Sequence, residues 1–209
     1  MLTPITRHRG LSLIELLVGI TILAFALGLM APSFTDWMRN ARVRSAAESL
    51  QDGLYYARSE AARRNAVVRF QLVSSTDGQC ALTTSGPAWV VNQSITTTPA
   101  GACGQAISDS SSPYLLKKSA TASTSDHTTL SANRSLLGFD GLGRLHNLNN
   151  TTEITTFAVN VTSSDGTCVA AGGTVQCLRV IVRPAGQISV CDPAHSGSSD
   201  PMTCPTLSN

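Results

Sequence analysis

The feature that most constrains this chain is an apolar run near its N-terminus, Leu11 to Ala31, which contains no Lys or Arg. At about 1.5 Å per residue, a helix over this run spans roughly 30 Å, the hydrocarbon thickness of a bilayer. Arg7 and Arg9 precede the run, so the positive-inside rule predicts a cytoplasmic N-terminus. We therefore expect a single-pass helix that places the rest of the chain outside the cytoplasm.

One carboxylate, Glu15, interrupts the run near its start. A charged side chain at the centre of a membrane helix costs about 2.5–3.5 kcal/mol on insertion scales, so we expect Glu15 to have a functional partner. An ordinary secretory signal is an alternative, because Ala24-Phe25-Ala26 has the small-x-small pattern of a cleavage site. The apolar run continues past that site, however, and neither a signal nor a plain anchor needs an acid.

The stretch RGLSLIELLVGITILAFALGLMAP resembles the N-terminus of type IV prepilins and type II secretion pseudopilins. In that family, a prepilin peptidase removes a short basic leader after a glycine, and the new N-terminus is methylated. The resemblance implies cleavage between Gly10 and Leu11, with methylation of Leu11. Glu15 matches the acidic fifth mature position, and Pro32 matches the proline that ends or kinks the first half of the helix. Leu11 departs from the family pattern, where Phe is usual.

Cleavage would create an α-ammonium at Leu11, one helical turn from Glu15. Because residues i and i+4 are neighbours on a helix, Glu15 can neutralise this amine in its own chain or in a neighbouring subunit. A buried ion pair is better evidence for a docking register than for stability. We therefore interpret Glu15 as an assembly charge.

After the apolar run, the pattern predicts an amphipathic helix over residues 32–64, because apolar residues recur at spacings of three and four. The apolar positions are Phe34, Trp37, Met38, Ala41, Leu50, Leu54, Ala57 and Ala61. Pro32 removes a backbone hydrogen bond, so a kink is expected there. Cations in the last turn suit the helix dipole, and Asn65 is suited to the C-cap.

The stretch ARSEAARRN, residues 57–65, is similar to the GspH/FimT group of minor pilins and pseudopilins. Two hairpins add to this resemblance: LGFDGLGRL, with its turn at Asp140-Gly141, and CLRVIVRPAGQISVC, with its turn at residues 184–186. Short β-branched segments predict strands. They are 66–74, 81–84, 89–92, 136–139, 144–146, 156–161, 178–183 and 187–191.

The predicted fold class is α+β and type IV pilin-like, with a long N-terminal helix, kinked near Pro32, packed on an antiparallel β-sheet or β-sandwich. The expected parts are a leader peptide over 1–10, a transmembrane assembly helix over 11–31, an amphipathic helix over 32–64 and a β-rich pilin domain over 65–209.

Six cysteines, Cys80, Cys103, Cys168, Cys177, Cys191 and Cys204, all lie in the part expected to be exported. An even count in such a region predicts disulfides, with free buried thiols as the alternative. Among fifteen possible connectivities, proximity along the chain favours 80–103, 168–177 and 191–204.

The sequence carries no Cys-x-x-Cys, phosphate loop, Gly-x-Ser-x-Gly elbow or metal-spaced histidine set. We therefore expect no enzyme, no cofactor and no metal. Residues 65–209 hold seven Lys or Arg and eight Asp or Glu, which is not the basic surface of a general nucleic-acid binder.

The resemblance implies a minor pilin that helps to initiate type IV pilus assembly at or near the tip, with roles in twitching motility or adhesion. Its partners would be other minor and major pilins and the prepilin peptidase, first in the inner membrane and then in the extracellular fibre. Two alternatives stay open: a FimT-like minor pilin that captures DNA for transformation, and a GspH-type pseudopilin of type II secretion. DNA-binding relatives carry Gly-Arg-x-Arg in the last hairpin, where this chain has Gly186-Gln187-Ile188-Ser189.

Overall fold

The computed structural model describes residues 12–93, 98–120, 127–146, 148, 155–197 and 200–205, with side chains omitted at 29–33. It divides into two compact units, Met1–Met38 and Arg39–Asn209. The expected leader, residues 1–10, and the expected new N-terminus, Leu11, lie outside the described residues.

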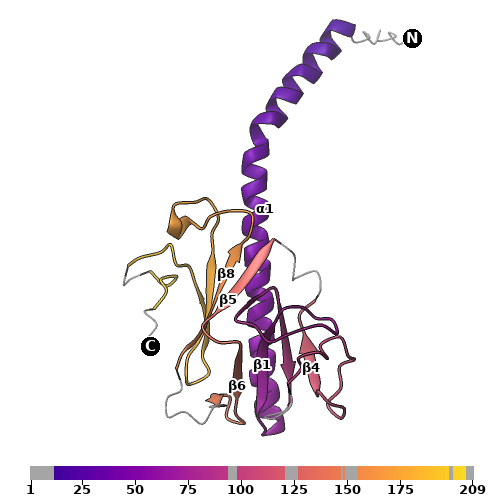
Figure 1. Ribbon diagram of the computed structural model, residues 1–209. Helices are drawn as coiled ribbons and strands as arrows, with labels where there is room; N and C mark the ends of the chain where they lie inside the picture. Colours follow the sequence, from indigo (N-terminus) through magenta and orange to yellow (C-terminus); the bar gives the residue numbers. More distant parts are fainter. Residues whose placement is uncertain are drawn as a thin grey trace, which may run out of the picture. The chain divides into compact units, whose positions relative to one another are not determined.

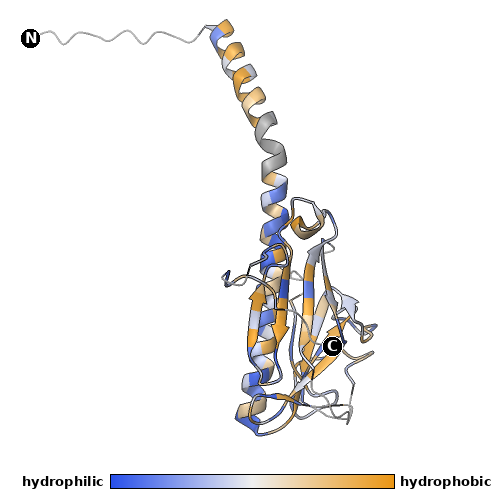
Figure 2. Ribbon diagram, turned by 90° about the vertical axis from the view of Figure 1, so that its left-hand side faces the viewer, coloured by the Kyte–Doolittle hydropathy of each residue, from blue (hydrophilic) through white to orange (hydrophobic). Residues whose placement is uncertain are grey.

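One helix, α1, runs from Leu13 to Arg64 and supplies residues to both units (Figure 1). Its N-terminal part is mostly hydrophobic in Figure 2, whereas the part after its grey segment alternates between hydrophilic and apolar residues. The helix assignment passes through Pro32 without a break. Pro32 therefore does not interrupt the helix, and the kink at this residue stays a prediction.

The helix ends at Asn65, which adopts the left-handed conformation with a φ of 49°. The Asn65 N–H donates to the Ala62 carbonyl over 3.4 Å, and the Ala66 N–H donates to the Ala61 carbonyl over 3.2 Å. This pair of bonds is the Schellman arrangement, which satisfies two carbonyls that a helix end leaves open. The predicted C-cap at Asn65 is formed.

Ten strands within the described residues form two antiparallel sheets (Figure 1). Sheet A has the order β4-β3-β1-β6-β7, and sheet B has the order β10-β9-β8-β5-β2. In chain order the strands are β1 Val68–Val73, β2 Ser85–Gly86, β3 Ala88–Asn92, β4 Leu115–Lys118, β5 Thr128–Ala132, β6 Leu136–Phe139, β7 Leu145–His146, β8 Phe157–Ser163, β9 Leu178–Val182 and β10 Ile188–Cys191. The predicted α+β fold with antiparallel sheets is confirmed.

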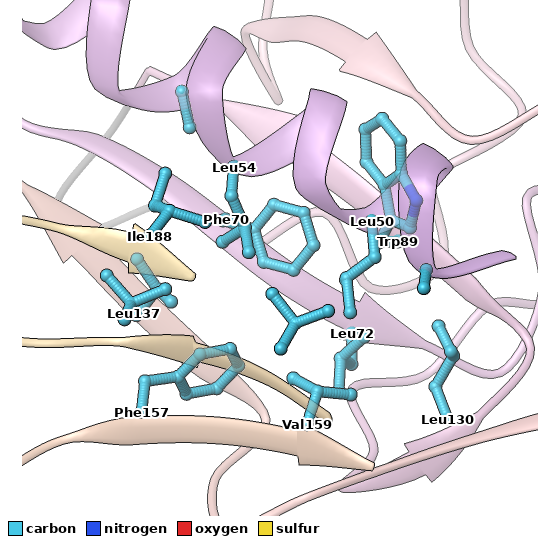
Figure 3. Packing of buried hydrophobic residues seen from close by; sticks show 14 of the residues in the cluster. Leu50, Leu54, Phe70, Leu72, Trp89, Leu130, Leu137, Phe157, Val159 and Ile188 are labelled. Carbon is cyan, nitrogen blue, oxygen red and sulfur yellow. The ribbon is translucent and has the colours of Figure 1, made fainter. Parts of the chain in front are cut away.

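A single large core joins the second part of α1 to both sheets (Figure 3). The helix contributes a fully or almost fully buried stripe consisting of Val43, Ala46, Ala47, Leu50, Leu54, Ala57 and Ala61. Phe70 from sheet A and Phe157 from sheet B are fully buried in the same cluster. The spacing of the helical stripe is what an amphipathic helix needs to cover a sheet with one face.

Phe34 and Trp37 differ from the predicted apolar positions that are buried, because they are 61% and 62% exposed. Ala41 is exposed as well. The buried stripe starts only at Val43. The apolar spacing before Val43 therefore does not correspond to buried core positions.

Three disulfides join Cys80 to Cys103, Cys168 to Cys177 and Cys191 to Cys204. These are the pairs that proximity along the chain favours. The first lies in a small cluster with residues of β1, β3 and β4, and the third packs against Ala158 and Ile181 of sheet B. The second contributes Cys177 to the main core, with Cys168 packed against it. Each bond closes a loop beside a sheet and so ties that loop down.

Candidate assembly surface

The first part of α1 carries large apolar side chains that are exposed on all sides. Leu13 is 81% exposed and Phe25 is 76% exposed. The other large members are Ile14, Leu16, Leu17, Val18, Ile20, Ile22 and Leu23, all at least 46% exposed. A helix that is hydrophobic all round requires apolar surroundings. This segment is therefore a candidate surface for assembly with other apolar helices or lipid.

Within the residues that the structure describes, no helix meets both the length and the hydropathy needed to cross a membrane.

Glu15 is exposed in the first turn of α1, among these apolar neighbours. A carboxylate in a first turn interacts favourably with the helix dipole, typically by about 0.3–1 kcal/mol at an exposed site. The proposed partner of Glu15 is the amine of Leu11, which lies outside the described residues, as does Gly10. The ion pair between Leu11 and Glu15 and the processing at Gly10 therefore stay predictions.

Phe34 and Trp37 form an exposed aromatic pair further along the helix. Their ring centroids are 5.9 Å apart, within the range in which aromatic rings attract each other. The two residues are three positions apart, which places them on one face of the helix.

The residues that resemble the GspH/FimT group gather where α1 meets the two hairpin turns. Arg58 Nε donates to the Gly143 carbonyl over 3.1 Å. Gly143 and Gly186 both have positive φ, 72° and 81°, which favours glycine. A Cβ on Gly186 would collide with the Gly143 carbonyl oxygen, and a Cβ on Gly141 would collide with Asn65. The motif residues therefore act together as a structural junction.

This junction was only partly visible in the sequence. The turn at Asp140 was predicted, and its carboxylate accepts from the backbone N–H groups of Leu142 and Arg144 at 2.9 Å each. The convergence of Arg58 with the last hairpin was missed. The signal for it is the glycine in each turn, since a glycine marks a position where another backbone can approach closely.

A second group of motif residues forms a network of ion pairs and hydrogen bonds in the last turns of α1. Glu60 is 8% exposed, and its carboxylate accepts from Arg63 and Arg64 at 2.7 Å each. The bond from Arg63 is the largest cause lowering the pKa of Glu60; burial opposes it, and the bond from Arg64 adds to the lowering. Arg64 also bonds Gln93 and Asp109, at 2.7 and 3.2 Å. This network fastens the helix end to sheet A, because Gln93 follows β3 directly.

The part of the chain that the structure describes holds no group of three or more His, Cys, Asp or Glu able to bind a metal. Two histidines lie instead beside carboxylates: His127 Nδ1 lies 2.5 Å from Asp165, and His195 lies 2.5 Å from Asp200 through Nδ1 and 3.7 Å from Asp192 through Nε2. Apart from the buried Asp192, these side chains are between about one third and one half exposed. Such pairs are typical of surface loops and do not define a reaction centre.

A helix with an apolar first part, and a β-rich unit packed around its second part, define a pilin-like α+β protein. Residues 46–186, more than half of the chain, match the family described as Type II transport protein GspH. The chain therefore belongs to the GspH family of pilin-like proteins. Residues 5–31 match the prokaryotic N-terminal methylation motif. Both matches confirm the resemblance to minor pilins and pseudopilins.

Two solved structures of the type IV minor pilin FimU of Pseudomonas aeruginosa, in space groups P65 and P21, are similar to this chain. The first is 19% identical with a TM-score of 0.45, covering 75% of this chain and 98% of FimU. The second is 17% identical with a TM-score of 0.47, covering 78% and 98%. No curated protein matches the sequence.

Proposed function

We propose that this chain is a minor pilin of a type IV pilus, which helps to initiate fibre assembly at or near the tip and thereby supports twitching motility or adhesion. The observation that carries the proposal is the exposed apolar segment of α1, Leu13 to Leu27. The core of the globular unit is already filled by Val43 to Ala61 of the same helix. The apolar segment is thus left for contacts with other subunits.

The proposal includes processing at the inner membrane. Prepilin peptidase cuts between Gly10 and Leu11, and Leu11 is then methylated; the match of residues 5–31 to the methylation motif supports this step. Before assembly the chain lies across the inner membrane at residues 11–31, with its N-terminus in the cytoplasm. Afterwards it is part of the extracellular fibre, with other minor and major pilins as partners.

In this proposal, Glu15 determines how neighbouring helices are positioned along their axes during assembly. An unpaired carboxylate among apolar helices is unfavourable by about 2.5–3.5 kcal/mol. Docking positions that bring Glu15 to an α-ammonium recover that energy, whereas positions shifted along the helix do not. The exposure of Glu15 supports such a role, because the side chain is accessible to a neighbour.

A substitution tests the role of Glu15. In cells expressing Glu15→Gln, the protein should reach the membrane in normal amount but be lost from sheared pili on immunoblots. Glu48→Gln is the matched control, because Glu48 is another exposed acid on α1, and this variant should enter pili normally. Normal incorporation of Glu15→Gln would contradict the register role.

A second candidate function is that of a GspH-type pseudopilin, which the description of the matching family, Type II transport protein, favours. Three disulfides and abundant Ser and Thr in the globular unit support a component exposed on the cell surface, and hence the pilus. Deletion of the gene distinguishes the two. Loss of surface pili and twitching supports the minor pilin, while loss of exoprotein secretion with intact pili supports the pseudopilin.

We do not propose capture of DNA. Gly186 is used in the junction with Gly143, and the side chain of Gln187 accepts from Arg183 over 2.7 Å. Gln187 and Ser189 stand at the two positions where the DNA-binding relatives have arginine. A gel shift showing tight, salt-sensitive binding of the full chain to duplex DNA at physiological salt would reverse this conclusion.

A further inference from the structure

The face of sheet B that points away from the main core carries a row of polar residues. Ser131 of β5 lies directly opposite Asn160 of β8, which lies directly opposite Arg179 of β9. Their chain neighbours Val159 and Val180 are fully buried in the core. Because side chains alternate along a strand, the row must face outward.

Arg179 is held in a fixed orientation within this row. Its Nε donates to Asn160 Oδ1 over 2.6 Å, and the side chain is half-buried. Within the described ranges of the chain, no carboxylate pairs with Arg179. Its terminal nitrogens are therefore available, in a plane that the bond to Asn160 sets in advance.

The row forms the floor of a groove of about 340 Å³. The Cys168–Cys177 disulfide and Ala170 border the groove, and so does Pro193. Ala170 lies in the loop that the Cys168–Cys177 bond closes, and Pro193 lies in the loop closed by the third disulfide. Disulfide bonds therefore anchor both borders of the groove to the sheet. Because these borders are held in place, they favour a groove that is already formed before a ligand binds.

We propose that this groove binds a carboxylate group, carried by an acidic peptide side chain or by an acidic sugar. A guanidinium presents parallel N–H donors that match the two oxygens of a carboxylate. The hydroxyl of Ser131, on the same floor, is a further donor. The volume lies in the range of small-ligand pockets.

The charge around the groove favours a single negative charge over a polyanion. One arginine supplies the cation, and residues 65–209 hold one more acid than base. Asp192 adjoins Pro193 at the border of the groove. A nucleic acid requires several phosphate contacts, which this surface does not offer.

The test uses the full chain in detergent micelles, labelled with 15N-arginine, and follows the Arg179 Nε–H signal by NMR. The probes are N-acetyl-glutamate N-methylamide and glucuronate, with N-acetyl-glutamine N-methylamide and glucose as their neutral counterparts. We expect a saturable shift with a Kd on the order of 1–10 mM for a carboxylate probe and none for the neutral molecules. Saturation by the glutamate derivative alone indicates a peptide ligand, and by glucuronate alone an acidic sugar.

Two variants separate the site from general charge effects. Arg179→Lys keeps the charge but loses the planar fork of N–H donors and the Nε–H reporter, so wild type and variants are also labelled uniformly with 15N and followed through the backbone amide of Asn160; we expect at least about tenfold weaker binding. Arg183→Lys is the matched control, because Arg183 follows β9 and its side chain bonds Gln187 instead; binding should be unchanged. The proposal is overturned if neither carboxylate gives a saturable shift, if the neutral probes act equally, if Arg179→Lys binds normally, or if a DNA duplex binds more tightly.

Discussion

Gly53 provides a sharp test of how α1 packs on sheet A. It lies inside the helix, where glycine is less favourable than alanine by about 1 kcal/mol. A Cβ at this position would lie only 2.7–2.8 Å from three ring atoms of Trp89. Trp89 is 3% exposed and stacks on Phe70 with ring centroids 5.4 Å apart. The indole therefore has little room to withdraw.

The effect of Gly53→Ala on the free energy of unfolding is the sum of two opposing contributions. Helix propensity favours Gly53→Ala by about 1 kcal/mol, whereas forcing an extra group into a packed core costs typically about 1–3 kcal/mol. Because the ring is buried and stacked, we expect a cost near the upper end. The predicted net destabilisation is about 1–2 kcal/mol, which lowers Tm by roughly 2–8 °C for a chain of this size.

Thermal unfolding of the oxidised full chain in mild detergent, followed by circular dichroism, measures this shift. Ser45→Ala is the control, because Ser45 is exposed on the same helix and reports propensity alone; it should raise Tm slightly. In a Trp89→Leu background the smaller side chain leaves space, so Gly53→Ala should become stabilising. A stabilising Gly53→Ala in the wild-type background, or an equal effect in both backgrounds, would refute the packing argument.

Two further predictions concern the disulfides and the end of the helix. Replacing both Cys80 and Cys103, which are 23 residues apart, by Ala should cost about 3 kcal/mol in the chain-entropy account; an unchanged Tm in oxidising buffer would contradict it. Glu60→Gln should cost about 1–3 kcal/mol near pH 7, because it removes charge-assisted bonds to Arg63 and Arg64. Since the folded pKa of Glu60 lies below its ordinary value, this stability is present above about pH 4.5 and fades as the pH falls through the folded pKa, so the variant and wild type should converge in acid.

The helix and its cap could be predicted from sequence because their signals are local. Apolar spacing marked Leu50, Leu54, Ala57 and Ala61 as core, and Asn65 marked the C-cap. The hairpin around Asp140 was equally clear, since a turn residue stands between two apolar segments. Each of these features depends on neighbours along the chain, which is the information that periodicity and turn chemistry carry.

Strands that depend on distant partners were harder to predict. β4 was missed because its two leucines serve different clusters: Leu115 packs beside the Cys80–Cys103 disulfide, and Leu116 packs in the main core. β5 was missed because Leu130 is its only large apolar residue. Conversely, the predicted strand at 81–84 forms a single bridge, between Leu82 and Val73, because Thr83 bonds the backbone of Ser85 and turns the chain.

The candidate sites likewise include features that depend on neighbouring residues in the sequence and features that depend on distant ones. The apolar segment and Glu15 could be read directly from residues 11–31. The row of Ser131, Asn160 and Arg179 could not be predicted from the sequence. Its members are 29 and 19 residues apart and meet only through the strand register. Register between distant strands is fixed by burial on the opposite face, which the sequence of any one strand does not reveal.

The central claim, that this chain is a processed pilin, is tested most directly by its mature N-terminus. Mass spectrometry of the protein isolated from membranes or sheared pili should identify a chain that starts at N-methylated Leu11. A chain that keeps residues 1–10, or one that starts after Ala24 or Ala26 as signal cleavage would produce, would contradict the account.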